Sequence, residues 1–149
     1  MEDKTIFMTG GAGFIGSTLI GRLIERNHIV VFDNLSRNAL SKLPYGSHRN
    51  LKLVFGDVTD SSALRDEMVK ADPHIVVHMA AIAGIDTVIK SPTTTMRVNL
   101  IGTLNALESA RGQPQRTVLR QRHSRGADGL RRRCPFGCRT AGYSAQHAL

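Results

Sequence analysis

The 149-residue sequence contains no apolar run of the ~18 residues needed to cross a bilayer. Its first residues (MEDK) lack the basic segment, apolar stretch and small-residue cleavage site of a signal peptide, so we expect a cytoplasmic protein. Lysine is absent after Lys90, and cysteine is absent before Cys134. These two absences divide the chain into two parts of different composition.

The formal net charge of +8 lies entirely in the second part. Residues 1–110 hold 5 lysines and 6 arginines against 11 acidic residues, whereas residues 111–149 hold 9 arginines against the single acid Asp128. A basic chain invites a nucleic-acid interpretation. Because the first 110 residues are neutral and the arginines at 131–133 stand without interleaved aromatic residues or a helix to carry them, we expect no nucleic-acid partner.

Apolar runs and helical spacing alternate along the first part. We expect strands at 4–9, 29–33, 51–55 and 74–78, and helices at 14–26, 61–70 and 92–110. Asp60 is placed to cap the second helix, and Pro92 to begin the third. Continuous apolar strands are typical of a parallel sheet covered on both faces. We therefore expect an α/β fold, a Rossmann-type sheet that stops after about the fourth or fifth strand.

Glycines at positions 10, 13 and 16 join the first strand to the first helix. Gly10 allows a tight turn, Gly13 lets the backbone approach a pyrophosphate, and Gly16 lets the helix pack closely on the sheet. Amides at the start of the helix then face the anion. A plain glycine-rich turn is the structural alternative. The placement between a strand and a helix favours a dinucleotide site.

Polar residues follow the second strand. A carboxylate at Asp33 can accept both hydroxyls of an adenosine ribose and repels a 2′-phosphate, which favours NAD over NADP. Asn34 and Ser36 can add polar contacts, while Arg37 weakens that preference because an arginine can bind a phosphate. A solvated aspartate at the end of a strand is the alternative for Asp33.

The third and fourth strands end in further candidate residues. Asp57 can accept a hydrogen bond from an adenine amino group, or it can simply cap a turn. Ala80 and Ala81 are small enough to leave room for a flat cofactor. A lone histidine such as His78 is more often a hydrogen-bonded core residue than a catalytic one. Asn99 lies within a helix, where asparagine has poor propensity.

Five motifs occur in the order and spacing of extended short-chain dehydrogenases/reductases: TGGAGFIG at 9–16, FDNLS at 32–36, GDV at 56–58, HMAA at 78–81 and VNLIGT at 98–103. Over residues 4 to about 110, the chain resembles the NAD-dependent epimerases and dehydratases of nucleotide sugars, and most closely the UDP-glucose 4-epimerase-like members. The motifs are specific for the family and say little about the substrate.

The resemblance implies NAD as the cofactor and a nucleotide sugar as the substrate of the full-length family, with a homodimer as a possible assembly. It implies that the glycines hold the pyrophosphate, that Phe14 and Ile15 offer backbone amides, and that Asp33 binds the ribose. It also implies that Asp57 and Val58 bind the adenine. The implied cofactor-binding set is Gly10, Gly13, Phe14, Ile15, Gly16, Asp33, Asn34, Ser36, Asp57, Val58, Ala80, Ala81 and Asn99, with Asn99 supporting the site through the helix it kinks.

The acid/base residues of that family are missing. Members use a tyrosine with a lysine four residues later, and a serine or threonine on the fifth strand. Tyr45 is followed by GSHR and Tyr143 by SAQH, and no lysine follows Lys90. We therefore name no catalytic residue and expect this chain to be inactive, although its family is enzymatic. A non-catalytic dinucleotide-binding module is the alternative.

The last residues do not continue the pattern. Val118 and Leu119 begin an apolar strand, but the sequence that follows is rich in arginine. We hypothesise a reading-frame shift near Arg120. When one permitted set of codons for residues 121–149 is translated one base later, the resulting peptide resembles the family's next segment. Otherwise we expect residues 120–149 to form an arginine-rich, disordered tail, in which CPFGC at 134–138 is too little for a metal site. Residues 1–119 are the expected incomplete NAD-binding domain.

Overall fold

A computed structural model of the protein describes residues 1–112. The expectations for the frame shift, the arginine-rich tail and the two cysteines concern residues outside this range. The elements are β1 (Thr5–Thr9), α1 (Phe14–Leu23), β2 (His28–Asp33), the 3-10 turns η1 (Leu40–Lys42) and η2 (Pro44–Ser47), β3 (Leu51–Phe55), α2 (Ser61–Ala71), β4 (Ile75–His78), α3 (Ile85–Lys90) and α4 (Pro92–Arg111).

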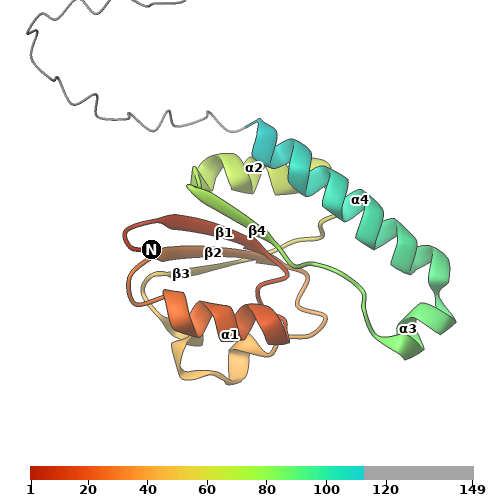
Figure 1. The fold of residues 1–149 in the computed structure, drawn as a ribbon, viewed down its shortest axis with the longest axis horizontal. Coiled ribbons are helices and arrows are strands. Elements are labelled where there is room, and N and C mark those ends of the chain that lie inside the picture. Colours follow the sequence, from red (N-terminus) through yellow and green to blue (C-terminus); the bar gives the residue numbers. More distant parts are fainter. Residues whose placement is uncertain (113–149) are drawn as a thin grey trace, which may run out of the picture. The chain divides into compact units, whose positions relative to one another are not determined.

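The four strands form one parallel sheet in the order β3-β2-β1-β4. Figure 1 shows α1 on one face of this sheet and α2 and α4 on the other, so the chain changes face between its first crossover and the crossover from β3 to β4. The expected α/β fold with helices on both faces is confirmed. The order places a topological switch point between β1 and β4, where open α/β sheets bind ligands.

Alternate residues of the central strands enter two apolar cores. Ile6 and Met8 of β1 pack toward α1 with Ile20, whereas Phe7 packs toward α2 with Leu64. These side chains are essentially inaccessible to solvent. The strand β3 borders the sheet and exposes Leu53 and Phe55, so burial on both faces holds for β1 and β2 rather than for every strand.

Most elements lie where the sequence predicts them, and the differences have local causes. The helix α1 ends at Leu23 rather than at position 26, because the Asn27 side-chain amide donates to the Leu23 carbonyl at 2.9 Å. Asp60 caps α2 as predicted, accepting from the amides of Ser62 and Ala63 at 3.1 Å. The turns η1 and η2 lie within the expected loop 34–50, and α3 was not predicted.

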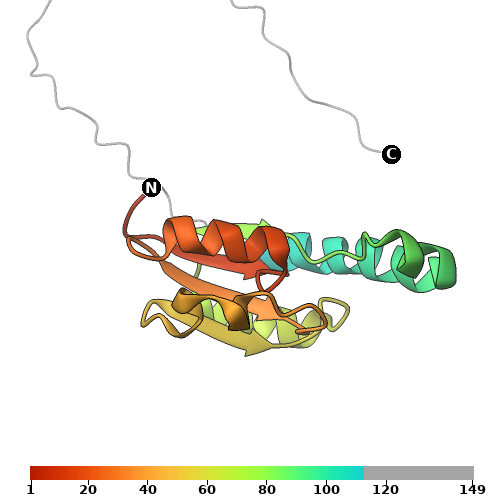
Figure 2. The same ribbon diagram turned by 90° about the horizontal axis from the view of Figure 1, so that it is seen from below.

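The apolar stripe of α4 faces away from the sheet. The periodicity of Met96, Leu100, Leu104 and Leu107 correctly predicts the helix, but all four side chains are at least half exposed. The buried residues of α4 are small or polar: Thr95, Gly102, Asn105, Ala106 and Ser109. Figure 2 shows α3 and the first turns of α4 projecting beyond the sheet. Within residues 1–112, no helix has the length and apolar character required to span a membrane.

Candidate cofactor site

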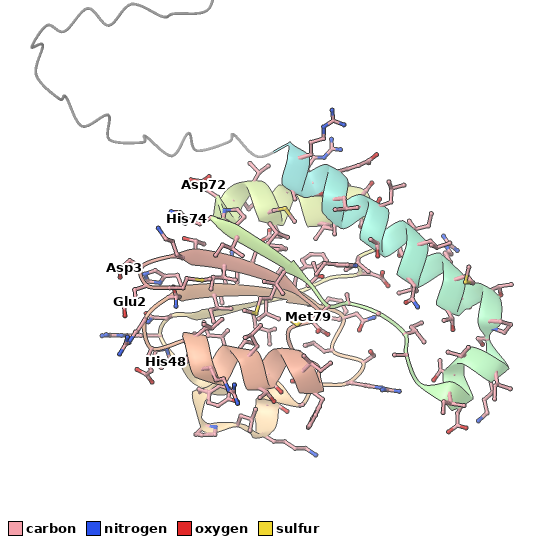
Figure 3. The ribbon with its side chains drawn as sticks, in the orientation of Figure 1. Glu2, Asp3, His48, Asp72, His74 and Met79 are labelled. Atoms are coloured by element: carbon pink, nitrogen blue, oxygen red, sulfur yellow. The ribbon has the colours of Figure 1, made fainter. Side chains whose placement is uncertain are left out.

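A pocket of about 390 Å³ lies at the carboxyl ends of the four strands. Each strand contributes the residue that follows its last one: Gly10 after β1, Asn34 after β2, Gly56 after β3 and Met79 after β4. Figure 3 shows Met79 at this end of the sheet, and His74 and Asp3 at the other end. Parallel strands thus bring four loops together around one cavity.

The glycine turn meets the predicted steric demands. Gly10 has a φ of +70°, and a Cβ there would lie 2.5 Å from the Ala80 nitrogen, so only glycine fits between β1 and the end of β4. A Cβ on Gly16 would lie 2.5 Å from the Gly11 carbonyl oxygen, because α1 starts directly against the end of the strand. At Gly13, which lines the pocket, a Cβ would lie 3.3 Å from the Gly10 carbonyl oxygen, which is also a tight contact.

The first amides of α1 have no acceptor among the described backbone hydrogen bonds. The first paired amide is that of Ser17, which donates to the Gly13 carbonyl at 2.9 Å. The amides of Phe14, Ile15 and Gly16 precede it, as expected for the first turn of a helix. No side chain caps this end of α1. Unpaired amides at the positive end of a helix dipole attract an anion.

Asp33 connects two loops of the site. One carboxylate oxygen accepts from the Ala12 amide at 3.0 Å, and the other accepts from the Leu35 amide at 2.7 Å. The residue is 8% exposed and lines the pocket, so it is not a solvated aspartate at the end of a strand. Each oxygen has a second lone pair, which can accept a ribose hydroxyl.

The residues after β2 and β3 shape their own turns. The Asn34 side-chain oxygen accepts from the Ser36 amide at 3.1 Å, and Asp57 accepts from both the amide and the hydroxyl of Thr59 at 2.8 Å. The turn-forming alternative for Asp57 is therefore present in the structure. Asp57 also lines the pocket together with Val58, so one carboxylate can serve both purposes.

His78 is hydrogen-bonded on both ring nitrogens, as the structural interpretation predicts. Thr103 donates to the Asn99 carbonyl at 2.6 Å, so its oxygen accepts from the His78 Nε2–H at 3.2 Å. This arrangement assigns the Nε2–H tautomer and leaves Nδ1 to accept from the Thr9 hydroxyl at 2.6 Å. Burial lowers the pKa of His78 below its ordinary value. His78 does not line the pocket.

Asn99 supports the pocket through its side chain. Its amide group accepts from the Ile82 N–H at 2.8 Å and donates to the Ile82 carbonyl at 3.0 Å. Both bonds hold the segment after β4, which lines the cavity. The helix α4 runs from Pro92 to Arg111, and this double contact joins it directly to the wall of the pocket, while the expected kink at Asn99 stays a prediction.

The structure brings most predicted residues together. Nine of them line the pocket: Gly10, Gly13, Asp33, Asn34, Ser36, Asp57, Val58, Ala80 and Ala81. Sequence reasoning missed Ile82, Ala83, Thr87 and Val98, which also line it. Thr87 belongs to α3, which is only six residues long and gives little periodic signal.

Tyr45 lies elsewhere. Its hydroxyl donates to the Ser17 carbonyl at 2.9 Å, and its ring occupies the space that a side chain at Gly21 would need.

Among residues 1–112, no group of three or more histidine, cysteine, aspartate or glutamate residues is arranged to hold a metal ion. The described site offers backbone amides, a glycine turn and carboxylates, a donor and acceptor set that fits a dinucleotide.

The profile of the "NAD dependent epimerase/dehydratase family" matches residues 6–122. The chain belongs to this family. It is 36% identical over 106 residues to the dTDP-L-rhamnose 4-epimerase of Burkholderia thailandensis, covering 69% of this chain and 29% of that protein. It is 39% identical over 114 residues to the dTDP-glucose 4,6-dehydratase of Streptomyces niveus, covering 70% of this chain and 33% of that protein.

A solved member shows the same fold. The UDP-glucose 4-epimerase from Brucella ovis in complex with NAD superposes with a TM-score of 0.63 and 34% identity, covering 72% of this chain and 32% of that one. The chain thus spans about a third of the length of these family members. The family includes NAD-bound and nucleotide-sugar-bound structures.

Proposed function

We propose that residues 1–119 are the NAD-binding portion of an NAD-dependent nucleotide-sugar epimerase or dehydratase. The observation that carries this proposal is the pocket at the strand ends, which is lined by Gly13 and the buried Asp33, with the unpaired amides of α1 directly following Gly13 in the chain. In such enzymes, bound NAD supplies hydride transfer at a sugar carbon.

Each wall of the pocket has a proposed task. The amides of Phe14, Ile15 and Gly16 bind the pyrophosphate, and the free lone pairs of Asp33 bind the adenosine ribose. Asn34 and Ser36 border the ribose. Asp57 and Val58 border the adenine, while Ala80 and Ala81 leave room for the nicotinamide. Asn99 keeps this last wall in place through Ile82.

We further propose that the 149-residue chain alone does not transfer hydride. Neither Tyr45 nor Tyr143 begins a Tyr-x-x-x-Lys motif, and Tyr45 is engaged with α1 outside the pocket. The nucleotide sugar is assigned as the substrate of the full-length family. A non-catalytic dinucleotide-binding module is the second candidate, and the same missing residues support it.

Calorimetric titration of the full chain with NAD tests the proposal. Asp33→Asn keeps one acceptor oxygen for the neighbouring amides but removes the charge, so we expect NAD affinity to fall about ten-fold. NADP should lose less, because the repulsion of its 2′-phosphate also disappears. Asp66→Asn, an exposed carboxylate on α2 outside the pocket, is the matched control. Absence of NAD binding by the unmodified chain would refute the proposal.

Dimerisation through α4 is a separate proposal. Its support is the exposed stripe of Met96, Leu100, Leu104 and Leu107, which no described residue covers. Light scattering of the unmodified chain and Leu104→Lys is the test, and a monomer in both cases contradicts it.

The cytoplasmic location and the lack of nucleic-acid binding stay predictions from the sequence.

A further inference from the structure

The carboxylates around the pocket repel a pyrophosphate unless a positively charged group offsets them. Asp33 and Asp57 place two carboxylates on its walls, and NAD brings two further negative charges on its phosphates. The amides at the start of α1 offer only a partial positive charge. Arg37 is the single lysine or arginine among the described residues that line the cavity.

Arg37 reaches from one side of the pocket to the other. It belongs to the loop after β2, but its Nη2 atom lies against Gly84, which follows β4 and precedes α3. A Cβ on Gly84 would lie 2.8 Å from Nη2 and 3.8 Å from Cζ. The guanidinium group therefore crosses the rim of the cavity.

Two further observations concern the surroundings of this side chain. Within residues 1–112 the Arg37 guanidinium has no hydrogen bond or ion pair, as also holds for the exposed Arg22, Arg65 and Arg97, but only Arg37 among them lines the pocket, where its donors can meet a ligand. Gly84 has φ −76° and ψ 126°, a conformation open to any residue. Its lack of a side chain thus serves to admit the guanidinium rather than to shape the backbone.

We propose that Arg37 binds the pyrophosphate of the dinucleotide across the mouth of the pocket, opposite the glycine turn. This inference rests on the proposed NAD-binding function and adds a residue to it. A guanidinium can donate two parallel hydrogen bonds to phosphate oxygens and is always charged. It would offset the two carboxylates and cover the bound phosphates. Arg37 is then a pyrophosphate contact, and it does not select for a 2′-phosphate.

The test compares ligands with and without phosphates on the full chain. Arg37→Gln should weaken NAD and NADP by a similar factor, about ten-fold, and leave adenosine unchanged in a magnetic-resonance titration. Gly84→Ala should weaken NAD in the same direction, because the added methyl displaces the flexible end of Arg37. Arg22→Gln, an exposed arginine on α1 outside the pocket, is the matched control and should bind like the unmodified chain.

Four results overturn the inference. A loss confined to NADP would assign Arg37 to the 2′-phosphate, and an equal loss for adenosine would show a purely structural contribution. Unchanged NAD affinity in Arg37→Gln would refute the pyrophosphate contact while leaving the proposed function intact. Failure of the unmodified chain to bind NAD refutes both, so the two failures are distinguishable.

Discussion

The helices α1 and α4 lie on opposite faces of one sheet and use their apolar residues in opposite ways. The helix α1 turns Ile20 into the core and leaves Phe14 and Ile15 exposed near the pocket. The helix α4 buries small and polar residues and exposes its leucines. Apolar periodicity therefore predicts that a segment is helical, but it does not establish which face meets the sheet.

The difference follows from what each helix must approach. The neighbours of α4 come close, since a Cβ on Gly102 would lie 2.6 Å from the Val58 side chain. The Asn105 amide donates to the Val58 carbonyl at 2.9 Å, which satisfies a buried polar group beside the pocket. Small residues at 102 and 106 let the helix pack against this turn, and longer side chains have room only on the opposite face.

The largest expected effect is a loss of stability when the buried face of α1 is truncated. Ile20→Ala removes a fully buried side chain, and we expect the free energy of unfolding to fall by about 3 kcal/mol in urea titrations. Leu104→Ala on α4 is the control, with an expected change below about 0.5 kcal/mol at protein concentrations where light scattering shows a monomer. Equal losses would abolish the contrast between the two helices.

A smaller effect tests the close approach of α4. In an exposed helix, Gly→Ala stabilises by about 0.5–1 kcal/mol. At Gly102 we expect the opposite sign, a loss of about 1 kcal/mol, because the new methyl group meets Val58. Thr94→Ala, at an exposed position of the same helix, should be neutral or stabilising. A more stable Gly102→Ala variant, measured by thermal unfolding, would contradict this packing.

The smallest effect concerns the link from β4 to α4 through His78 and Thr103. Because the pKa of His78 is lower in the folded chain, the unfolded chain takes up a proton first as the pH falls. The stability contribution is complete above the unfolded pKa of ~6.5 and declines below it. Unfolding titrations at pH 7.5 and 5.5 should show less pH dependence in His78→Gln. An identical slope in both proteins would contradict a lowered pKa of His78 in the folded chain.

Much of the fold could be predicted from the sequence, for identifiable reasons. Short apolar runs in the sequence predict the strands, and Asp60 predicts the start of α2 because its side chain can cap a helix. Gly10 directly follows β1, Asp33 ends β2 and Asp57 lies two residues after β3, so the convergence of these pocket residues follows from parallel topology. Ile82 and Val98 were missed because their place depends on the contact from Asn99 across 17 residues. Contacts of this kind carry no local signal in the sequence.

The carboxylate of Asp33 joins the loop at Ala12 to the turn at Leu35 through hydrogen bonds made within the protein. The conformational entropy of ordering these loops is therefore lost during folding and not again at binding. Such a preorganised cavity should capture its ligand as a nearly rigid receptor. We expect association to be a single fast step whose rate depends on encounter rather than on loop closure, and differences in affinity between variants to appear mainly in dissociation rates.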